Sequence, residues 1–247
     1  MAQASHCPAE LIERIDITAS LAVFRFRVAE HLTFTAGQFA TISVKAAGDL
    51  VERPYSIVSS PYEQFLEFFI ELVPGGILTP KLWELKTGST ILVRPRIVGR
   101  FTLDAHVNRH LMLATVTGVA PFVSILRTQQ IDRGRGAASN HQFVVIHGAS
   151  HSADFGPYLG ELKALSRAGW LRYIPTISRP WEEPNWKGET GRVEDLVRKH
   201  ADQLGLHHGN SVAYACGHPQ MVAKVREILE RARFLKDQIK EEEYFAD

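Results

Sequence analysis

The chain has 247 residues, of which 45% are hydrophobic and 22% charged, and its formal net charge is +1. This length suits two compact domains, the ordinary composition excludes a disordered or fibrous chain, and the small net charge favours neither nucleic acid nor a membrane as partner. Two cysteines, Cys7 and Cys216, are too few for a disulfide framework or for an iron–sulfur cluster held by four cysteines of this chain. The first residues are partly acidic, and no stretch approaches the roughly 18 apolar residues of a transmembrane helix, so we expect a cytoplasmic protein without a secretory signal.

Short strand-like segments separated by glycine-containing turns fill the N-terminal part of the chain. Leu21–Val28 alternates apolar and polar side chains, and three further apolar segments follow: Phe39–Val44, Leu66–Val73 and Thr90–Val93. Short strands at this spacing are typical of an antiparallel barrel or sandwich. We therefore predict an antiparallel β-barrel domain over residues 1–103.

From about His110 onward, strands alternate with helices. The predicted strands are Leu111–Thr115, Phe143–Ile146, Leu171–Ile177 and Ser211–Cys216. Helical patterns follow them, of which Tyr158–Arg167 and Gln220–Phe234 are the clearest. This alternation predicts a parallel sheet covered on both faces, in an α/β domain over residues 104–247.

A cation, an aromatic ring and a hydroxyl lie close together in Arg53-Pro54-Tyr55-Ser56, which we place at the start of a strand. Alternation along a strand sends Arg53 and Tyr55 to one side. An arginine suits a pyrophosphate, and a tyrosine can cover a flavin ring. Taken alone, these residues fit an edge strand with an exposed arginine equally well.

Two glycine-containing turns could bind phosphate. Gly75-Gly76-Ile77-Leu78-Thr79-Pro80 offers backbone amides and a hydroxyl near a possible helix start, although a simple threonine cap has the same pattern. Thr115-Val116-Thr117-Gly118 directly follows a predicted strand and opens a helix, where amides and the helix dipole face an anion. Only one glycine is present, so this turn lacks the G-x-G-x-x-G fingerprint.

Polar residues follow the later strands. Ser178-Arg179 comes after the third parallel strand, at the end where ligands bind in open sheets, and suits the 2′-phosphate of NADP. Arg192, after Gly191, is a second candidate phosphate ligand. The alternative interpretation of these arginines is that they are solvated side chains in loops. Cys216 lies at the end of the fourth strand, and the alternative interpretation of this residue is a small buried hydrophobic side chain.

A metal site is not expected. His147 and His151 are four residues apart, which is a spacing found among metal ligands on helices. However, His147 falls on a predicted strand and the neighbouring sequence offers no third ligand.

Together these segments resemble the plant-type ferredoxin–NADP reductase superfamily, and most closely the bacterial ferredoxin/flavodoxin–NADP(+) reductases. The resemblance runs from about Ile12 to the end of the chain. It rests on the order of six landmarks: Arg53-x-Tyr55-Ser56, the Gly-x-x-Thr turn, the strand–turn–proline segment, Ser178-Arg179, Cys216-Gly217-x-Pro219-x-Met221 and an acidic, aromatic C-terminus. It implies an FAD-binding antiparallel barrel followed by an NADP-binding α/β domain.

The resemblance also implies roles for single residues. For FAD these are Arg53 on the pyrophosphate, Tyr55 on the isoalloxazine, Ser56 near flavin N5, the backbone of Phe69, Ile70 and Glu71 on the ribityl and phosphate, and Gly76 and Thr79 at the phosphate site. For NADP(H) they are Thr117 and Gly118 on the pyrophosphate, Ser178, Arg179 and Arg192 on the 2′-phosphate, and Cys216 beside the nicotinamide. Near the C-terminus, Glu242 or Glu243 and an aromatic residue, Tyr244 or Phe245, would approach the flavin.

The chain departs from the family pattern at two positions. Val116 stands where the family usually has the first glycine of Gly-Thr-Gly, and Ser150 stands where close relatives often carry an arginine for NADP. Both departures bear on nucleotide affinity and on the preference for NADPH.

The implied activity is that of a ferredoxin/flavodoxin–NADP(+) reductase, in which hydride transfer between NADPH and FAD is coupled to one-electron exchange with ferredoxin or flavodoxin. An acidic carrier could dock on basic residues of the N-terminal half, namely Lys81, Lys86, Arg94, Arg96 and Arg100. Two alternatives stay open. One is an NAD(P)H-dependent reductase component of an oxygenase or a free-flavin reductase, and the other is a flavin- or nucleotide-binding regulator without turnover.

Overall fold

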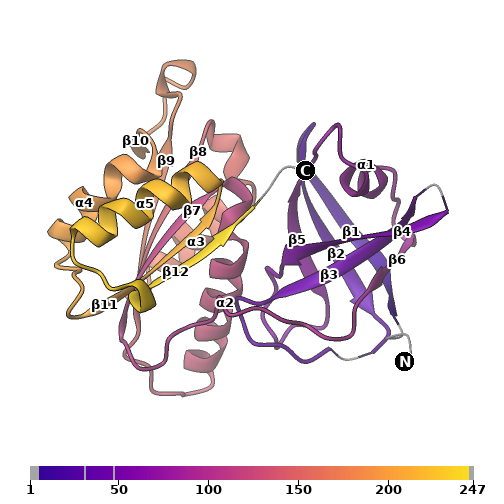
Figure 1. The fold of residues 1–247 in the computed structure, drawn as a ribbon, viewed down its shortest axis with the longest axis horizontal. Helices are drawn as coiled ribbons and strands as arrows, with labels where there is room; N and C mark the ends of the chain where they lie inside the picture. The colour runs from indigo at the N-terminus through magenta and orange to yellow at the C-terminus, as the bar shows by residue number, and fades with distance from the viewer. Residues whose placement is uncertain (1–5, 31, 47, 245–247) are drawn as a thin grey trace. The chain divides into compact units, whose positions relative to one another are not determined.

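A computed structural model describes residues 6–30, 32–46 and 48–244, and the chain forms two compact units (Figure 1). The first unit contains the chain up to Leu103 together with Ala120–Ala137, and the second contains Asp104–Val119 together with the chain from Ala138 to Phe245. The first unit therefore gains a helical segment from the C-terminal part of the sequence. The domain division into residues 1–103 and 104–247 stays a prediction.

The first unit is built on a six-stranded antiparallel sheet with the strand order β4-β3-β6-β1-β2-β5. Its elements are β1 (Cys7–Thr18), β2 (Leu21–Val28), β3 (Phe39–Ala46), β4 (Asp49–Ser56), β5 (Leu66–Glu71), α1 (Leu78–Trp83), β6 (Thr90–Val93) and α2 (Ala120–Gly134). Side chains from every strand form one apolar core, and Phe24, Phe26 and Phe68 are fully buried in it. The alternation seen in Leu21–Val28 therefore does mark one core-facing side of a strand.

The sheet curls, so that its two edge strands approach each other. The ring of Tyr55 on β4 lies 6.4 Å from the ring of Phe68 on β5, in an edge-on arrangement. Among the described residues no hydrogen-bonded pairing joins β4 to β5, so the antiparallel domain is a curled half-barrel. One expectation was wrong in position: Arg53-Pro54-Tyr55-Ser56 ends β4 and does not begin a strand.

Helix α2 is anchored to the first unit by polar contacts. The hydroxyl of Ser124 donates to the carbonyl of Ser59 at 2.7 Å. The buried carboxylate of Glu67 on β5 pairs with Arg127 of α2 at 3.1 Å and with Arg25 of β2 at 2.6 Å. A carboxylate that is 1% exposed needs such partners because an isolated buried charge is strongly unfavourable.

The second unit is built on a six-stranded sheet with the order β10-β9-β8-β7-β11-β12, in which every pairing is parallel. Its elements are β7 (Arg109–Thr115), η1 (Val116–Val119), β8 (Gln142–Ala149), η2 (Ser152–Phe155), α3 (Tyr158–Ser166), β9 (Leu171–Ile177), η3 (Pro180–Glu182), β10 (Glu189–Thr190), α4 (Val193–Gln203), β11 (Ser211–Gly217), α5 (Pro219–Arg231), η4 (Lys236–Gln238) and β12 (Ile239–Glu243). The predicted parallel α/β sheet is confirmed. The edge strand β12, rich in glutamate, was not predicted.

Apolar faces of α4 and α5 cover one side of this sheet. The two helices lie next to each other in Figure 1, and their buried residues share one core cluster with residues of β7, β8, β9 and β11. All seven residues of β11 are buried, as expected for a central strand of a parallel sheet that is covered on both faces. Among the described residues, no helix is long and apolar enough to cross a membrane.

Candidate functional site

The strand order of the second unit reverses at β7. The chain proceeds from β7 to β8 and β9 on one side, whereas β11 and β12 lie on the other side of β7. In open parallel sheets, ligands bind at the carboxyl ends of the strands where the order reverses in this way. The residues at this point are Val116–Val119 after β7, and Cys216 and Gly217 at the end of β11.

Two glycines let the backbones of these segments touch. A Cβ atom on Gly118 would lie 2.2 Å from the carbonyl oxygen of Cys216, and a Cβ atom on Gly217 would lie 2.3 Å from the hydroxyl oxygen of Thr115. Gly217 also has a φ of +126°, which favours glycine. The hydroxyl of Thr115 accepts a hydrogen bond from the backbone amide of His218 at 2.9 Å. The turn after β7 therefore rests directly on the end of β11.

Val116 holds the turn in a left-handed conformation with a φ of +44°. A β-branched residue is rare in this region because its side chain crowds the backbone, and the family pattern has glycine here. The side chain packs against a small cluster formed by Ala149, Phe155 and Ile177. The turn thus has the positive φ that glycine adopts without strain, and the valine side chain at this position is sterically strained.

A buried histidine fixes this turn from the neighbouring strand. The Nε2 atom of His147, on β8, lies 2.8 Å from the carbonyl oxygen of Val116, and the Nδ1 atom lies 3.1 Å from the hydroxyl of Tyr173. A carbonyl can only accept, so Nε2 carries the proton and the tyrosine donates to Nδ1. Burial lowers the pKa of His147 to about 4, which keeps the ring neutral.

His147 is a residue that the sequence interpretation considered only as a metal ligand. Its partner His151 in that hypothesis lies at the start of η2 and contacts Glu182 at 2.7 Å. Among the described residues, no group of three or more His, Cys, Asp or Glu side chains is placed to hold a metal ion. Nothing in the sequence signals that His147 bonds to a turn 31 residues earlier in the chain.

Cys216 lies beside the C-terminal strand. The parallel register of β11 and β12 sets Cys216 opposite Glu242 and Gly217 opposite Glu243, and the amide of Tyr244 donates to the carbonyl of Gly217 at 2.9 Å. The thiol is completely buried. Burial, and then the negative charge of Glu242, raise the pKa of Cys216 well above its usual range, so this group is a neutral thiol.

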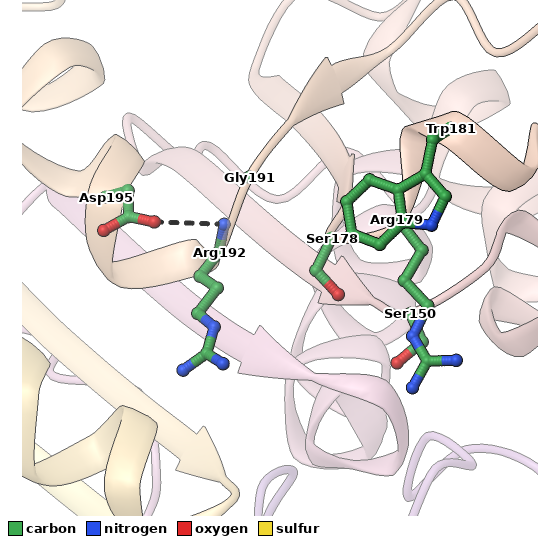
Figure 2. A pocket seen from close by; sticks show the side chains of 7 residues that line it. All are labelled: Ser150, Ser178, Arg179, Trp181, Gly191, Arg192 and Asp195. Carbon is green, nitrogen blue, oxygen red and sulfur yellow. Dashed lines mark hydrogen bonds between the residues drawn. The ribbon is translucent and has the colours of Figure 1, made fainter. Parts of the chain in front are cut away.

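An open pocket of about 480 Å³ lies at the ends of β8 and β9 and at the start of α4 (Figure 2). Its lining residues are Ser150, Ser178, Arg179, Trp181, Gly191, Arg192 and Asp195. Figure 2 shows the guanidinium groups of Arg179 and Arg192 on either side of Ser178. Two guanidinium groups, two hydroxyls and the N-terminus of α4 form a donor set suited to a phosphate monoester.

Trp181 is the lining residue that the sequence interpretation missed. Its side chain is 72% exposed, which is unusual for so large an aromatic group. It follows the predicted Ser178-Arg179 pair within η3. An exposed indole next to a phosphate-binding donor set offers a flat surface for a purine base.

In the first unit, the predicted flavin residues lie at the end of the edge strand β4. Arg53 is exposed, and its Nη1 atom donates to the carbonyl of Glu52 at 2.9 Å. Tyr55 is partly buried, and Ser56 is buried. A cation and a ring on one side of an edge strand are compatible with the pyrophosphate and ring system of FAD.

The second group of predicted flavin residues lies on β5, the opposite edge of the same sheet. Phe69 and Ile70 are buried and Glu71 is exposed, and among the strands of the described residues β5 pairs only with β2. The contact of this strand's backbone with FAD, which the resemblance implies, stays a prediction. Phe245 lies outside the described residues.

The turn before α1 is held by its own threonine. The hydroxyl of Thr79 accepts from the amide of Val73 at 3.0 Å and lies 3.3 Å from the carbonyl of Val73. The amide of Gly76 also donates to Val73, at 2.9 Å. Thr79 thus stabilises the turn, and its contact with a phosphate stays a prediction, as does that of Gly76.

The structure thus distributes most of the predicted residues over four places. Thr117 and Gly118 lie in η1, where Gly118 contacts the backbone of Cys216, and Ser178, Arg179 and Arg192 share the pocket. The flavin residues are divided between the two edges of the curled sheet: Arg53, Tyr55 and Ser56 on β4, and Phe69, Ile70 and Glu71 on β5.

Comparison with known protein families assigns both halves of the chain. Residues 8–102 match the oxidoreductase FAD-binding domain family, and residues 112–227 match the oxidoreductase NAD-binding domain family. These matches agree with the predicted order of the two domains. They also assign FAD and a nicotinamide nucleotide as the cofactors.

Individual relatives narrow the family further. A flavodoxin/ferredoxin–NADP reductase of Escherichia coli is 35% identical to this chain over 200 residues, which are 77% of each of the two chains. A ferredoxin–NADP reductase of Azotobacter vinelandii is 31% identical, and the aligned part covers 84% of this chain and 83% of the relative. A solved ferredoxin NADP+ reductase of Neisseria gonorrhoeae with bound FAD and NADP has the same fold, with a TM-score of 0.85 at 24% identity over 98% of this chain and 100% of its own. The resemblance deduced from the sequence is therefore confirmed. The chain belongs to the flavodoxin/ferredoxin–NADP reductase family.

Proposed function

We propose that this chain is a ferredoxin/flavodoxin–NADP(+) reductase that binds FAD in its N-terminal domain and NADP(H) on its C-terminal sheet. Hydride passes between NADPH and FAD, and single electrons are exchanged with ferredoxin or flavodoxin. The names of the most similar relatives support the reaction and the class of carrier. A cytoplasmic location is part of the same proposal.

The donor set of the pocket carries the NADP(H) assignment. Ser178, Arg179 and Arg192 would hold the 2′-phosphate, and the exposed indole of Trp181 would stack on the adenine. In NAD-specific sites an acidic residue accepts hydrogen bonds from the ribose hydroxyls at this strand end, whereas arginines accommodate the phosphate of NADP. Ser150 lines the same pocket without a positive charge, so the two arginines supply its cationic side chains.

Thr117 and Gly118 would bind the pyrophosphate of NADP(H). Their turn is fixed by Gly118 against the backbone of Cys216 and by His147 against the carbonyl of Val116. Because these contacts do not involve the nucleotide, the turn is formed before the nucleotide arrives. This preorganisation lowers the entropic cost of binding.

Cys216 and Glu242 would lie beside the nicotinamide ring, with Tyr244 as the nearby aromatic residue. A neutral, buried thiol packs against a flat ring and excludes water from it, and it does not act as a nucleophile. The carboxylate of Glu242 would favour positive charge at the reacting centre, as on the oxidised nicotinamide. Glu243 is one position further along β12, and Phe245 stays a candidate.

In the first domain, Arg53 would bind the FAD pyrophosphate, Tyr55 would cover the isoalloxazine and Ser56 would lie near flavin N5. The backbone of Phe69, Ile70 and Glu71, together with Gly76 and Thr79, would complete the FAD site. When bound, FAD supplies the ring that accepts a hydride and returns electrons one at a time. The chain's own contribution is to position that ring and to exclude water.

An acidic carrier would dock on basic residues of the N-terminal domain. Of the five basic residues considered, Lys81 pairs with Glu84 at 2.9 Å and Arg94 pairs with Glu52. These two side chains therefore contribute little net positive charge. Lys86, Arg96 and Arg100 remain the stronger candidates for contact with an acidic carrier.

Two measurements test the function. The purified protein should be yellow with bound FAD, and anaerobic addition of NADPH should bleach the flavin absorbance within the stopped-flow time range. The reduced enzyme should then pass electrons to ferredoxin or flavodoxin. A protein that stays colourless when offered FAD would refute the proposal.

The nucleotide assignment has its own test, the substitution Arg179→Ala. Hydrogen bonds to charged groups contribute about 1.5–3 kcal/mol, so KM for NADPH should rise about 10- to 100-fold, while KM for NADH changes little. Arg198→Ala is a matched control, because Arg198 is an exposed arginine of α4 that pairs with Asp202 and does not line the pocket. Equal losses for both nucleotides would remove Arg179 from its assigned role.

A further inference from the structure

An acidic side chain shares Arg179 with the expected phosphate. Glu182, three residues further along the chain, lies 3.7 Å from Nη1 of Arg179. The same carboxylate lies 2.7 Å from Nε2 of His151, which begins η2 after β8. One carboxylate at the pocket thus has two cationic partners, and one of them, His151, changes its charge near neutral pH.

A phosphate monoester brings up to two negative charges into this arrangement. While Glu182 is the counter-ion of Arg179, the incoming phosphate meets an arginine whose charge is already partly balanced. When His151 is protonated, its full positive charge faces Glu182 at hydrogen-bond distance. The carboxylate is then neutralised from the other side, and the charge of Arg179 is available to the ligand.

We propose that Glu182 is a built-in competitor of the 2′-phosphate for Arg179, and that protonated His151 relieves this competition, so that these two residues set how strongly the chain prefers NADPH over NADH. The inference rests on the proposed function of the pocket. It adds two residues that do not line the pocket, and it adds a dependence on pH.

The charges around His151 and Glu182 are consistent with this assignment. The groups that face His151 are Glu182, Asp154 at 3.7 Å from Nδ1, Arg179 and Glu183. Hydrogen bonding to Glu182 is the largest cause that raises the pKa of His151 above its ordinary value of 6.5, and the same contact lowers the pKa of Glu182. The contact therefore keeps His151 protonated to a higher pH than an isolated imidazole and keeps Glu182 ionised to a lower pH.

The second arginine of the pocket also has an acidic neighbour, but that carboxylate pairs with a lysine and not with a histidine. Arg192 lies 4.0 Å from Glu194, which pairs with Lys224 at 3.4 Å, and Asp195 accepts a hydrogen bond from the backbone amide of Arg192 at 3.3 Å. Asp195 therefore caps α4, as Figure 2 shows. No histidine lines the pocket, so a pH effect above neutrality originates from the Arg179 side.

The experiment measures binding of adenosine 2′,5′-bisphosphate to the FAD-loaded protein by calorimetry at pH 6.5 and pH 8.5. The second pKa of a phosphate monoester is about 6, so part of the ligand is still singly protonated at pH 6.5, which weakens its binding at that pH and therefore opposes the expected effect. Exposed ion pairs contribute about 0.2–1 kcal/mol, which corresponds to a change of up to about fivefold. We expect the wild-type protein to bind about two- to fivefold more tightly at pH 6.5, with proton uptake that shows as a dependence of the heat on buffer ionisation enthalpy.

Two variants separate the parts of the inference. Glu182→Gln should bind about two- to fivefold more tightly than wild type at pH 8.5 and should lose the pH dependence. His151→Gln keeps a hydrogen-bond donor without the charge, so it should bind at both pH values as weakly as wild type does at pH 8.5. Adenosine 5′-monophosphate, which lacks the 2′-phosphate, should show none of these changes.

Glu227→Gln is the matched control, because Glu227 forms a similar exposed pair with Arg231 on α5, away from the pocket lining. It should leave both affinities unchanged. If Glu182→Gln binds no more tightly at pH 8.5, or if His151→Gln keeps the full pH dependence, the inference is wrong while the proposed function stands. If the wild-type protein does not bind adenosine 2′,5′-bisphosphate at all, both are wrong.

Discussion

Substitution of Gly118 by alanine tests the contact on which the nucleotide turn depends. The added methyl group would lie 2.2 Å from the carbonyl oxygen of Cys216, 2.7 Å from its carbonyl carbon and 2.8 Å from the Cα atom of Gly217. Ordinary van der Waals contact begins near 3.4 Å. All three neighbours are backbone atoms of the last two residues of β11, so none of them can rotate away as a flexible side chain would.

The expected cost follows from two opposing terms. Overpacking a well-packed interior destabilises a protein by about 1–3 kcal/mol. Replacing glycine by alanine returns about 0.4–1 kcal/mol, because the unfolded chain loses conformational freedom. Gly118→Ala should therefore lower the free energy of unfolding by up to about 2.6 kcal/mol, and we expect the upper half of that range because the overlapping neighbours are backbone atoms. The turn must also move by more than about 1 Å to relieve the overlap, so nucleotide affinity should fall at least tenfold.

Chemical denaturation and titration with NADP+ measure both effects, and Gly160→Ala is the control. Gly160 lies within α3, and a Cβ atom there would meet nothing within 4 Å. Alanine is better than glycine in a helix interior by about 1 kcal/mol, so this variant should be more stable, with unchanged nucleotide affinity. If Gly118→Ala matches wild type in stability and affinity, the close backbone contact does not hold the turn.

Two further predictions concern stability. First, acidification should destabilise the fold through the buried histidines His110 and His147, because burial lowers their pKa values to about 3 and about 4. Below pH 6.5 the unfolded chain therefore binds protons that the folded chain does not. Urea unfolding should show that each histidine lowers the free energy of unfolding by about 1–2 kcal/mol between pH 7 and pH 5. Second, Glu67→Ala should lower the free energy of unfolding by about 2–4 kcal/mol in the same assay, because it leaves Arg25 and Arg127 without their shared buried carboxylate.

Each of these predictions has a control. His147→Gln should remove about half of the pH dependence of stability between pH 7 and pH 5, because His110 still contributes its share, and an unchanged slope would exclude His147 as a source. Glu84→Ala breaks an exposed pair with Lys81 and should change stability by less than about 0.5 kcal/mol. A loss at Glu67 no larger than that at Glu84 would show that burial adds nothing to the ion pair.

The core strands could be predicted from the sequence because burial left a clear pattern in them. Leu21–Val28, Thr90–Val93 and Leu171–Ile177 were predicted with the bounds that the structure gives. The strand Ile239–Glu243 could not, since it consists largely of charged residues and forms only because β11 offers an edge to pair with. Pairing partners, and not local propensity, decide such a strand.

The candidate site divides in the same way. Ser178, Arg179 and Arg192 follow elements that the sequence reveals, and the structure places all three in one pocket. The positions of His147 and Glu182 relative to the site depend on contacts over 31 residues, which periodicity does not encode. The placement of Arg53 at the start of a strand failed because β4 already begins at Asp49, and its first two residues, Asp49 and Leu50, are exposed and leave no burial pattern in the sequence.

The C-terminal strand contains three consecutive glutamates, and its pairing sets the middle one, Glu242, opposite Cys216. A slip of that pairing by one residue in either direction would still leave a carboxylate opposite the thiol, because Glu241 and Glu243 flank Glu242. The aromatic residue is duplicated on one side only, because Phe245 follows Tyr244 in the sequence whereas Glu243 precedes it. The charge at this place therefore tolerates a slip in either direction, whereas an aromatic residue is kept in one direction alone.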